Sequence, residues 1–260
     1  MLHRRRIGRP TAGAGYNGPV CTVSWFFEAE GYQLFFNRDE RRTRKRALPP
    51  SLREDGPLPY IAPRDGDFGG SWIGVNSAGL ALGLLNGYTE ASEIEPANGF
   101  ISRGLLLNSL LDCRSTVELA KRLGNIDTDR YRSFLLLALE PVGRGSLATW
   151  SHGSLRNEPL TEEHVPLVSS SFATEEVRGS RIDLFRRMRR AWSGDRSGLH
   201  LAYHESHRPA AGPYSPCMHR PDAKTVSFSW IHVGPRRIRF RYAPHSPCGG
   251  RPGDPVEMSS

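Results

Sequence analysis

Two apolar runs joined by a short turn decide the fold, in the stretch CTVSWFFEAEGYQLFFNRDE at residues 21–40. Residues 21–27 and 32–37 are rich in β-branched and aromatic side chains, which favour strands. Residues 28–31 separate the two runs and end in glycine, as is typical of a hairpin turn. The stretch therefore predicts a β-hairpin whose second strand closes with the polar quartet Asn37-Arg38-Asp39-Glu40.

The rest of the chain continues with paired strands and places helices between the pairs. Further strands are predicted at 71–75, 80–85, 134–139, 147–150, 225–233 and 237–242, and helices at 104–111, 115–123 and 178–192. Residues 41–70 hold a basic run and many prolines, which predict a long exposed loop. Because hairpins outnumber strand–helix–strand crossovers, the pattern favours an α+β fold with antiparallel sheets.

Length and composition are those of a soluble globular protein. Of the 260 residues, 38% are hydrophobic and 9% are aromatic, well above the values of disordered chains. The longest apolar run, residues 134–139, is far shorter than the 18 or so residues of a membrane-spanning helix. Four scattered cysteines without a CxxC pair predict free thiols in a reducing compartment, and hence a cytoplasmic protein.

Residues 1–20 form a basic leader. They hold four arginines and no acid, and so carry half of the net charge of +8. The arginines lead into Pro10-Thr11-Ala12-Gly13 instead of the apolar segment of a secretory signal. We expect this leader to be disordered, and either to be removed or to reflect a wrongly assigned start site.

Cys21 and the polar quartet are the candidate site. The predicted hairpin brings Arg38 and Asp39 back beside Cys21, which places a cation and a carboxylate near a thiol. A thiol with an ordinary pKa of about 8.5 is mostly protonated at neutral pH and needs a base or a cation to act as a nucleophile. The alternative is purely structural: a buried cysteine that begins a strand, and an Arg–Asp ion pair at a strand end.

Four blocks, in the same order, resemble the NRDE family, which is also called the transport and Golgi organisation family. They are CTV at 21–23, NRDE at 37–40, GGSWIGVN at 69–76 with Gly79-Leu80 after it, and CMHRPDAKTVS at 217–227. The resemblance implies a fold like that of N-terminal nucleophile hydrolases, a four-layer αββα sandwich of two antiparallel sheets. It implies a single domain at 21–250, followed by a flexible tail at 251–260.

In such hydrolases the first residue of the mature chain is the nucleophile, and its own α-amino group is the base. The resemblance thus implies Cys21 as the nucleophile that cleaves a carbon–nitrogen bond in a small linear amide, with no cofactor and no metal. Arg38 and Asp39 would hold the α-amine and the substrate carbonyl. Asn86, which precedes a glycine, would help to form an oxyanion hole, although an Asn-Gly pair is also ordinary turn chemistry.

Two further residues are expected to contact the substrate. Trp72 follows the loop predicted at 41–70, and both are placed to line the pocket. Ser170 lies in a serine-rich stretch where related hydrolases carry a second asparagine. That departure weakens the case for ordinary amidase activity.

A free amino group at Cys21 requires the loss of the preceding residues. One possibility is that translation starts at Val20, whose codon then serves as an alternative initiation codon. The initiator residue is removed, and the preceding leader is an artefact of a wrongly assigned start site. Alternatively, the leader is a propeptide that is cleaved before Cys21. If the leader stays, the protein does not catalyse in this way, and the rival hypothesis is a non-catalytic member that binds a small or lipid-like ligand, or a cofactor, in the same cleft.

Other patterns carry weaker predictions. Two of them contain metal-binding residue types: the helical stripe His200, His204 and His207, and the CxH pair Cys217 and His219 with Cys248 distant. We expect the stripe to be a solvated polar face, and the CxH pair alone is weak evidence for zinc. The basic runs lack interleaved aromatic residues, so nucleic acid is not an expected partner. The oligomeric state is left open.

Overall fold

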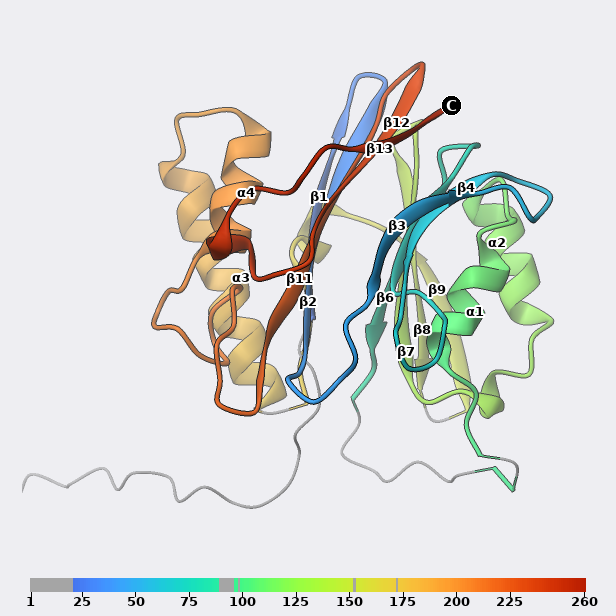
Figure 1. Cartoon of the computed structure of the whole chain (residues 1–260), viewed down its shortest axis with the longest axis horizontal. Coiled ribbons are helices and arrows are strands. Elements are labelled where there is room, and N and C mark those ends of the chain that lie inside the picture. The colour runs from blue at the N-terminus through green and yellow to red at the C-terminus, as the bar shows by residue number, and fades with distance from the viewer. Residues whose placement is uncertain (1–20, 89–95, 98, 152, 172) are drawn as a thin grey trace, which may run out of the picture.

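The computed structural model describes residues 21–88, 96–97, 99–151, 153–171 and 173–260. The basic leader predicted at 1–20 lies outside the described residues. The described strands form two antiparallel sheets that stack face to face, with helices on the outside of each (Figure 1).

Sheet A contains the predicted hairpin. Its six strands are β1 (Cys21–Glu28), β2 (Gly31–Arg41), β10 (Leu167–Ser169), β11 (Ala223–Val233), β12 (Arg237–Ala243) and β13 (Val256–Ser259). They lie in the order β10-β1-β2-β11-β12-β13, and each neighbouring pair is antiparallel. In the hairpin Cys21 lies opposite Arg38, and Glu28 lies opposite Gly31. The predicted hairpin is therefore confirmed.

Sheet B follows the order of the chain. Its seven strands are β3 (Leu48–Arg53), β4 (Tyr60–Arg64), β5 (Ile73–Asn76), β6 (Ala81–Asn86), β7 (Phe134–Glu140), β8 (Arg144–Ser151) and β9 (Ser154–Pro159). Each strand pairs with the next in antiparallel fashion.

Four α-helices complete the layers. They are α1 (Arg103–Leu110), α2 (Thr116–Gly124), α3 (Thr174–Ala191) and α4 (Arg196–Glu205), and short 3₁₀ turns lie at η1 (Thr128–Arg130), η2 (Glu162–His164) and η3 (Pro247–Gly249). Helices α1 and α2 cover the outer face of sheet B, whereas α3 and α4 cover that of sheet A (Figure 1). The expected αββα sandwich is confirmed.

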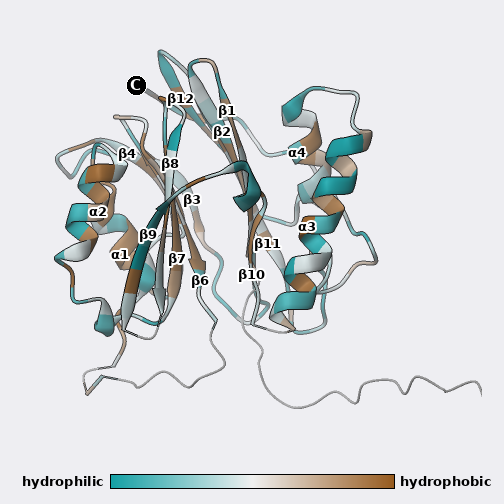
Figure 2. Ribbon diagram, turned by 180° about the vertical axis from the view of Figure 1, so that it is seen from behind, coloured by the Kyte–Doolittle hydropathy of each residue, from teal (hydrophilic) through white to brown (hydrophobic). Residues whose placement is uncertain are grey.

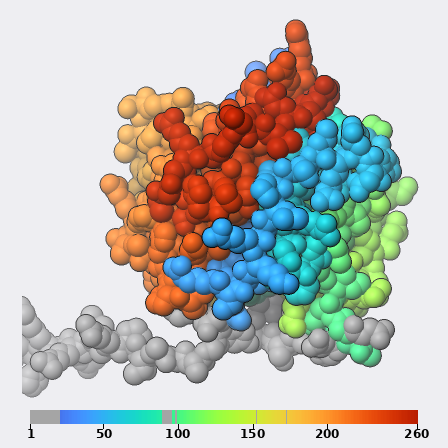
Figure 3. Space-filling model, viewed as in Figure 1, coloured from blue at the N-terminus to red at the C-terminus, as the bar shows by residue number. Residues whose placement is uncertain are grey.

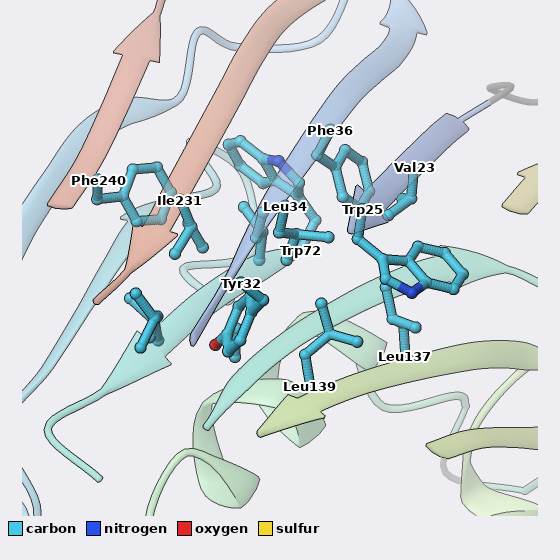
Figure 4. Packing of buried hydrophobic residues seen from close by; sticks show 14 of the residues in the cluster. Val23, Trp25, Tyr32, Leu34, Phe36, Trp72, Leu137, Leu139, Ile231 and Phe240 are labelled. Atoms are coloured by element: carbon cyan, nitrogen blue, oxygen red, sulfur yellow. The ribbon is translucent and has the colours of Figure 1, made fainter. Parts of the chain in front are cut away.

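The main core lies between the two sheets. Side chains alternate along a strand, so every second residue of β2 points into this space. Leu34 and Phe36 of β2 pack there with Trp25 of β1, and with Leu137 and Leu139 of β7 (Figure 4). All of these side chains are buried, and their removal from water is the main force that joins the sheets.

Smaller cores hold the helices on the sheets. Leu107 and Leu110 of α1 pack on Leu82 and Leu136 of sheet B. Phe185 of α3 packs with residues of α4 on the other side of the molecule. Hydrophobic residues accordingly lie along the strands and on the inward helix faces (Figure 2). Of the helices in the described part of the chain, none is both long and apolar enough to cross a membrane.

The prediction of a long exposed loop at 41–70 is wrong, because β3 and β4 lie there. Pro49 and Pro50 sit in β3, which is the edge strand of sheet B. An edge strand tolerates proline since its outer side needs no backbone donor. The prolines that indicate a loop in the sequence thus mark a sheet edge in the structure.

The flexible tail predicted at 251–260 also needs correction. Val256–Ser259 forms β13, which pairs with β12 from Arg237↔Ser259 to Phe240↔Val256. β13 also lies beside β3 of sheet B, and the space-filling view shows this C-terminal segment against the light-blue residues of β3 and β4 (Figure 3). The C-terminal strand therefore covers the seam between the sheets at this edge.

Candidate active site

A cleft of about 450 Å³ opens at one end of the sandwich, between the two sheets. Five of the six predicted site residues line it: Cys21, Arg38, Asp39, Trp72 and Asn86. They come from β1 and β2 of sheet A, from β6 of sheet B and from the loop that precedes β5. Ser170 is not among the residues that line the cleft.

Cys21 begins β1 and is only 7% exposed. It lies opposite Arg38 on one side and opposite Ser169 of β10 on the other. Directly paired residues of antiparallel strands project from the same face, so all three side chains point into the space between the sheets. The residue beside the thiol in β10 is therefore Ser169 and not the predicted Ser170. The Oγ atom of Ser169 is buried and has no hydrogen-bond partner among the described residues.

The thiol of Cys21 is strongly held in its protonated form. Burial, together with the smaller effect of the Asp39 charge, raises the pKa of Cys21 to about 12. A backbone hydrogen bond from Asp39 and the guanidinium of Arg38 act in the opposite direction but do not outweigh burial. This cysteine is thus no preformed thiolate and needs a base during any reaction.

Arg38 is fixed in place by partners from both sheets. Its Nη2 atom donates to Asp65 Oδ2 at 2.5 Å and lies 3.6 Å from Glu40 Oε2. Its Cζ atom lies 4.0 Å from the centre of the Trp72 ring, in a cation–π contact. These contacts hold the guanidinium over the floor of the cleft, on the same face as the Cys21 thiol.

Asp65 is a site residue that the sequence does not reveal. It follows β4 and accepts hydrogen bonds from Arg38, from Arg44 Nη2 at 2.7 Å, and from the Phe68 N–H at 2.9 Å. Burial opposes ionisation, but the Phe68 N–H and the two arginines together hold the pKa of Asp65 below its ordinary value. The only local signal is its position before Gly66 in a segment that predicts a loop.

Asp39 points to the opposite face of sheet A. Its carboxylate accepts from Thr225 Oγ1 at 2.5 Å and lies 3.3 Å from Arg181 Nη2 of α3. Burial raises the pKa of Asp39 to about 7, while Arg181 and Thr225 act to lower it. Because adjacent strand residues alternate faces, the side chains of Arg38 and Asp39 do not act together as predicted. Asp39 bonds to Cys21 through its backbone, and its carboxylate acts on the thiol only by its charge.

Asn86 ends β6, on the sheet B side of the cleft. Its Nδ2 atom donates to the hydroxyl of Tyr88 at 3.0 Å. Burial raises the pKa of Tyr88, and the charge of a Cys21 thiolate would raise it further, which places Tyr88 near the thiol. Asn86 and Cys21 therefore line the same cleft from opposite sheets, and the role of the Asn86 amide in an oxyanion hole stays a prediction.

The two glycines before Trp72 allow the cleft to form. Gly69 has a φ of +72°, which side chains disfavour, and a Cβ on Gly70 would lie 2.3 Å from the carbonyl carbon of Gly104. The Ser71 N–H donates to the Gly104 carbonyl at 3.0 Å. The backbone before Trp72 therefore lies directly against the start of α1, which closes one wall of the cleft.

The cleft carries mixed charge with an excess of arginine. Five arginines line it, Arg38, Arg41, Arg44, Arg103 and Arg132, together with the carboxylates of Glu40 and Asp65. Asp39 also borders the cleft, but its carboxylate lies on the other face of sheet A. Phe68, Leu84, Phe100 and Ile101 add apolar surface.

The predicted histidine stripe is not a solvated face. His200 and His204 of α4 are buried, and both bond to the hydroxyl of Ser24, at 2.7 Å and 2.9 Å. Burial lowers the pKa of His200 to about 3 and that of His204 well below its ordinary value. They join α4 to sheet A as neutral rings.

His207 separates from this pair. It lies instead with Cys217, His219 and Cys248. The sequence treats these residues as two weak patterns, and the structure combines them into one cluster.

Comparison with known proteins now gives the family. The family model of Transport and Golgi organisation 2 matches residues 21–187, which is more than half of the chain. The chain belongs to the Transport and Golgi organisation 2 family. The matched region of this family begins at Cys21 and contains every residue of the cleft. A comparison of the sequence with curated proteins found no significant match.

Solved structures similar to this member of the family include an acylase and an acid amidase. Penicillin V acylase from Agrobacterium tumefaciens aligns with a TM-score of 0.51 and 13% identity, over 86% of this chain and 83% of the acylase. The Caenorhabditis elegans ortholog of N-acylethanolamine-hydrolyzing acid amidase aligns with a TM-score of 0.54 and 11% identity, over 82% of this chain and 92% of the amidase. At these identities the likeness establishes the shared fold.

Proposed function

We propose that the protein is an N-terminal nucleophile hydrolase that cleaves a carbon–nitrogen bond in a linear amide through Cys21. The observation that carries the proposal is the position of Cys21. It begins a strand that borders the cleft, opposite Arg38, and Asn86 of the other sheet lines the same cleft. The fold shared with the acylase and the amidase supports the same assignment.

The state of the thiol supports an α-amine as the base. With a pKa of about 12, only about one Cys21 thiol in 10⁵ is ionised at pH 7. Among the described residues that line the cleft there is no histidine or lysine to take its proton. A freed α-amine at residue 21, with an ordinary pKa of about 7.7–8.0, is a base of suitable strength within one residue of the thiol.

The reaction then has two stages. The thiol proton passes to the α-amine as sulfur attacks the acyl carbon, and one N–H of Asn86 stabilises the oxyanion while the other stays with Tyr88. The α-ammonium returns the proton to the leaving nitrogen as the carbon–nitrogen bond breaks, which leaves a thioester on Cys21. Water, deprotonated by the same amine, hydrolyses the thioester to a carboxylic acid and restores the thiol.

The lining of the cleft supports an inference about the substrate class. Arginines outnumber carboxylates, and aromatic and aliphatic side chains lie between them. The substrate we infer is an amide with an apolar acyl group and a negatively charged group at the arginines. The names of the similar proteins suggest penicillin V and N-acylethanolamines as first probes, because both are amides of apolar acyl groups.

Three forms of the chain test this proposal. The first begins at Cys21, the second carries one additional glycine before Cys21, and the third is the full chain of 260 residues. The additional glycine converts the amine of Cys21 to an amide but keeps the thiol and the cleft. Each form is incubated with a panel of N-acyl amino acids, penicillin V and an N-acylethanolamine, and the release of amine is measured.

We expect release only from the form that begins at Cys21, and its loss in Cys21→Ala. Intact-mass measurement of protein made from the native gene shows whether residue 21 is freed in the cell. Equal affinity of all three forms for a ligand, with no release of amine by any of them, would support the rival function of a non-catalytic binding protein.

A further inference from the structure

A cluster of four metal-binding side chains lies outside the cleft. His207, Cys217, His219 and Cys248 each place one ligand atom so that all four atoms lie within 4.8 Å of one another. None of the four lines the cleft. The cluster is therefore separate from the proposed hydrolase site.

Two of the distances within the cluster are close to those of a tetrahedral zinc site. Sγ of Cys217 and Sγ of Cys248 each lie 3.4 Å from Nε2 of His219. In a tetrahedron with Zn–S of about 2.3 Å and Zn–N of about 2.0–2.1 Å, a sulfur and a nitrogen ligand are about 3.6 Å apart. The ring of His207 lies edge-on to His219, with 5.0 Å between the ring centres. Because all four ligand atoms already lie within 4.8 Å of one another, movement of the side chains alone completes the coordination.

Three separate segments supply the ligands. His207 follows α4, Cys217 and His219 lie in the connection that precedes β11, and Cys248 lies in η3. Hydrogen bonds to backbone carbonyls hold these segments together. The Cys217 N–H donates to the Ser206 carbonyl at 3.1 Å. The hydroxyl of Ser246 also donates to the Thr225 carbonyl. The ligand atoms thus converge on a scaffold that is already fixed.

We propose that His207, Cys217, His219 and Cys248 bind one Zn²⁺ ion in a closed, structural site. Two thiolates balance the charge of the ion, and two neutral imidazoles complete the four ligands of a structural site. All four positions are filled by the protein, so no position is left for a substrate or a water molecule. The exposure of Cys248 fits this role, because an exposed thiol contributes nothing to the core.

The ion would stabilise contacts on the face of sheet A that points away from the cleft. Met218 lies between two of the ligands, and its N–H donates to Thr225 Oγ1 at 2.8 Å. The same hydroxyl donates to Asp39, which follows Arg38 in β2. A bound ion therefore secures a chain of contacts that runs from the connection before β11 to the strand that carries Arg38.

Metal content of the full chain tests the proposal. Protein purified under reducing conditions is loaded with Zn²⁺, dialysed, and measured by inductively coupled plasma mass spectrometry. We expect about one ion per chain in the wild type and a small fraction of that in Cys248→Ser and His207→Ala. These two positions are exposed, so their variants leave the core intact. His245→Ala, next to η3, and Cys21→Ala, in the cleft, are the matched controls and should keep the ion.

Cobalt gives a second, independent readout. Co²⁺ in the wild type should show the absorption bands of a tetrahedral site and of sulfur-to-metal charge transfer, and Cys248→Ser should show only a small fraction of both. Removal of the ion should lower the thermal midpoint of the wild type by several degrees but leave that of Cys248→Ser unchanged.

Two results would overturn the proposal. One is that the fully reduced wild type takes up no Zn²⁺. This result would count even if Cys217 and Cys248 form a disulfide in protein that has not been reduced. The other is a metal content that is the same in the wild type and in both ligand variants.

Discussion

Cys21 and Arg38 are direct cross-strand partners in the β1–β2 hairpin, so the thiol and the guanidinium project from the same face of sheet A. Asp39, the next residue, projects from the other face and pairs with Arg181 below the sheet. The side chains of the NRDE quartet thus contact both faces of sheet A. Arg38 faces the cleft, and Asp39 anchors β2 to the helix α3 that covers it.

Asp65 should be required to hold Arg38 in the cleft. In Asp65→Asn, Arg38 loses its charged partner in a buried setting, and the free energy of unfolding should fall by about 3 kcal/mol. Asp67→Asn is the matched control, since Asp67 pairs with Arg44 at 2.8 Å but is more exposed, and should cost less than about 1 kcal/mol. Urea unfolding of both variants measures the difference. Equal losses would contradict the role given to Asp65.

Two arginines of α3 should differ strongly in their contribution to stability. Arg181 is fully buried against Asp39, so Arg181→Leu leaves a buried carboxylate without its cation and should cost about 3–5 kcal/mol. Arg189 pairs with Glu162 at 2.9 Å, but both side chains are more than half exposed, and Arg189→Leu should cost less than about 1 kcal/mol. Thermal or urea unfolding decides. A neutral effect of Arg181→Leu would show that Asp39 is uncharged when folded.

The buried histidines should make the protein less stable in acid. The pKa of His200 is about 3 when folded against 6.5 when unfolded, so the stability from the neutral ring is complete above pH 6.5 and is lost as the pH falls toward 3. The loss is up to about 1.4 kcal/mol for each pH unit. Asp39 has a raised pKa of about 7, so its contribution to stability increases as the pH falls. This contribution is the same in the wild type and in the histidine variant.

His200→Phe isolates the contribution of that histidine. Between pH 6.5 and 4.5, the free energy of unfolding should fall less steeply in His200→Phe than in the wild type, because the variant has no ring to protonate. Parallel curves for the two proteins would show that His200 is not held neutral by burial.

Gly70 should tolerate no side chain. In Gly70→Ala the new methyl group meets the backbone of Gly104, so α1 or the cleft wall must move, and we expect a loss of about 2 kcal/mol or more. Gly179 is a control within α3, because a Cβ there meets nothing within 4 Å, and Gly179→Ala should stabilise the protein by about 0.5–1 kcal/mol. Thermal unfolding of the pair measures both signs. A stable Gly70→Ala would contradict the close approach.

The hairpin and the pairing of Cys21 with Arg38 follow from the sequence, because strand composition and turn length are local properties. The orientation of Asp39 follows from the alternation of side chains along a strand. Because Asp39 is adjacent to Arg38 in the sequence, the pair suggests a joint role, but the two side chains lie on opposite faces of the sheet. Asp65 is different. Its contact with Arg38 depends on β3 and β4, where prolines at a sheet edge are indistinguishable from prolines in a loop.

The cluster of His207, Cys217, His219 and Cys248 shows the same limit. The CxH spacing brings only Cys217 and His219 together, and nothing local connects them with a histidine after α4 or a cysteine in η3. The pairing of β11 with β12 and the turn after β12 bring these segments together. Contacts between distant segments are therefore the part of the site that sequence patterns do not predict.

The most direct test of the central claim is the mass of the protein during turnover of an amide. The chain that begins at Cys21, quenched in acid shortly after mixing with substrate, should carry one acyl group, and peptide mapping should place it on Cys21. The chain with one extra glycine before Cys21 should carry none, although its cleft is the same. Equal acylation of the two forms, or acylation of neither form across the amide panel, would contradict an α-amine acting as base at Cys21.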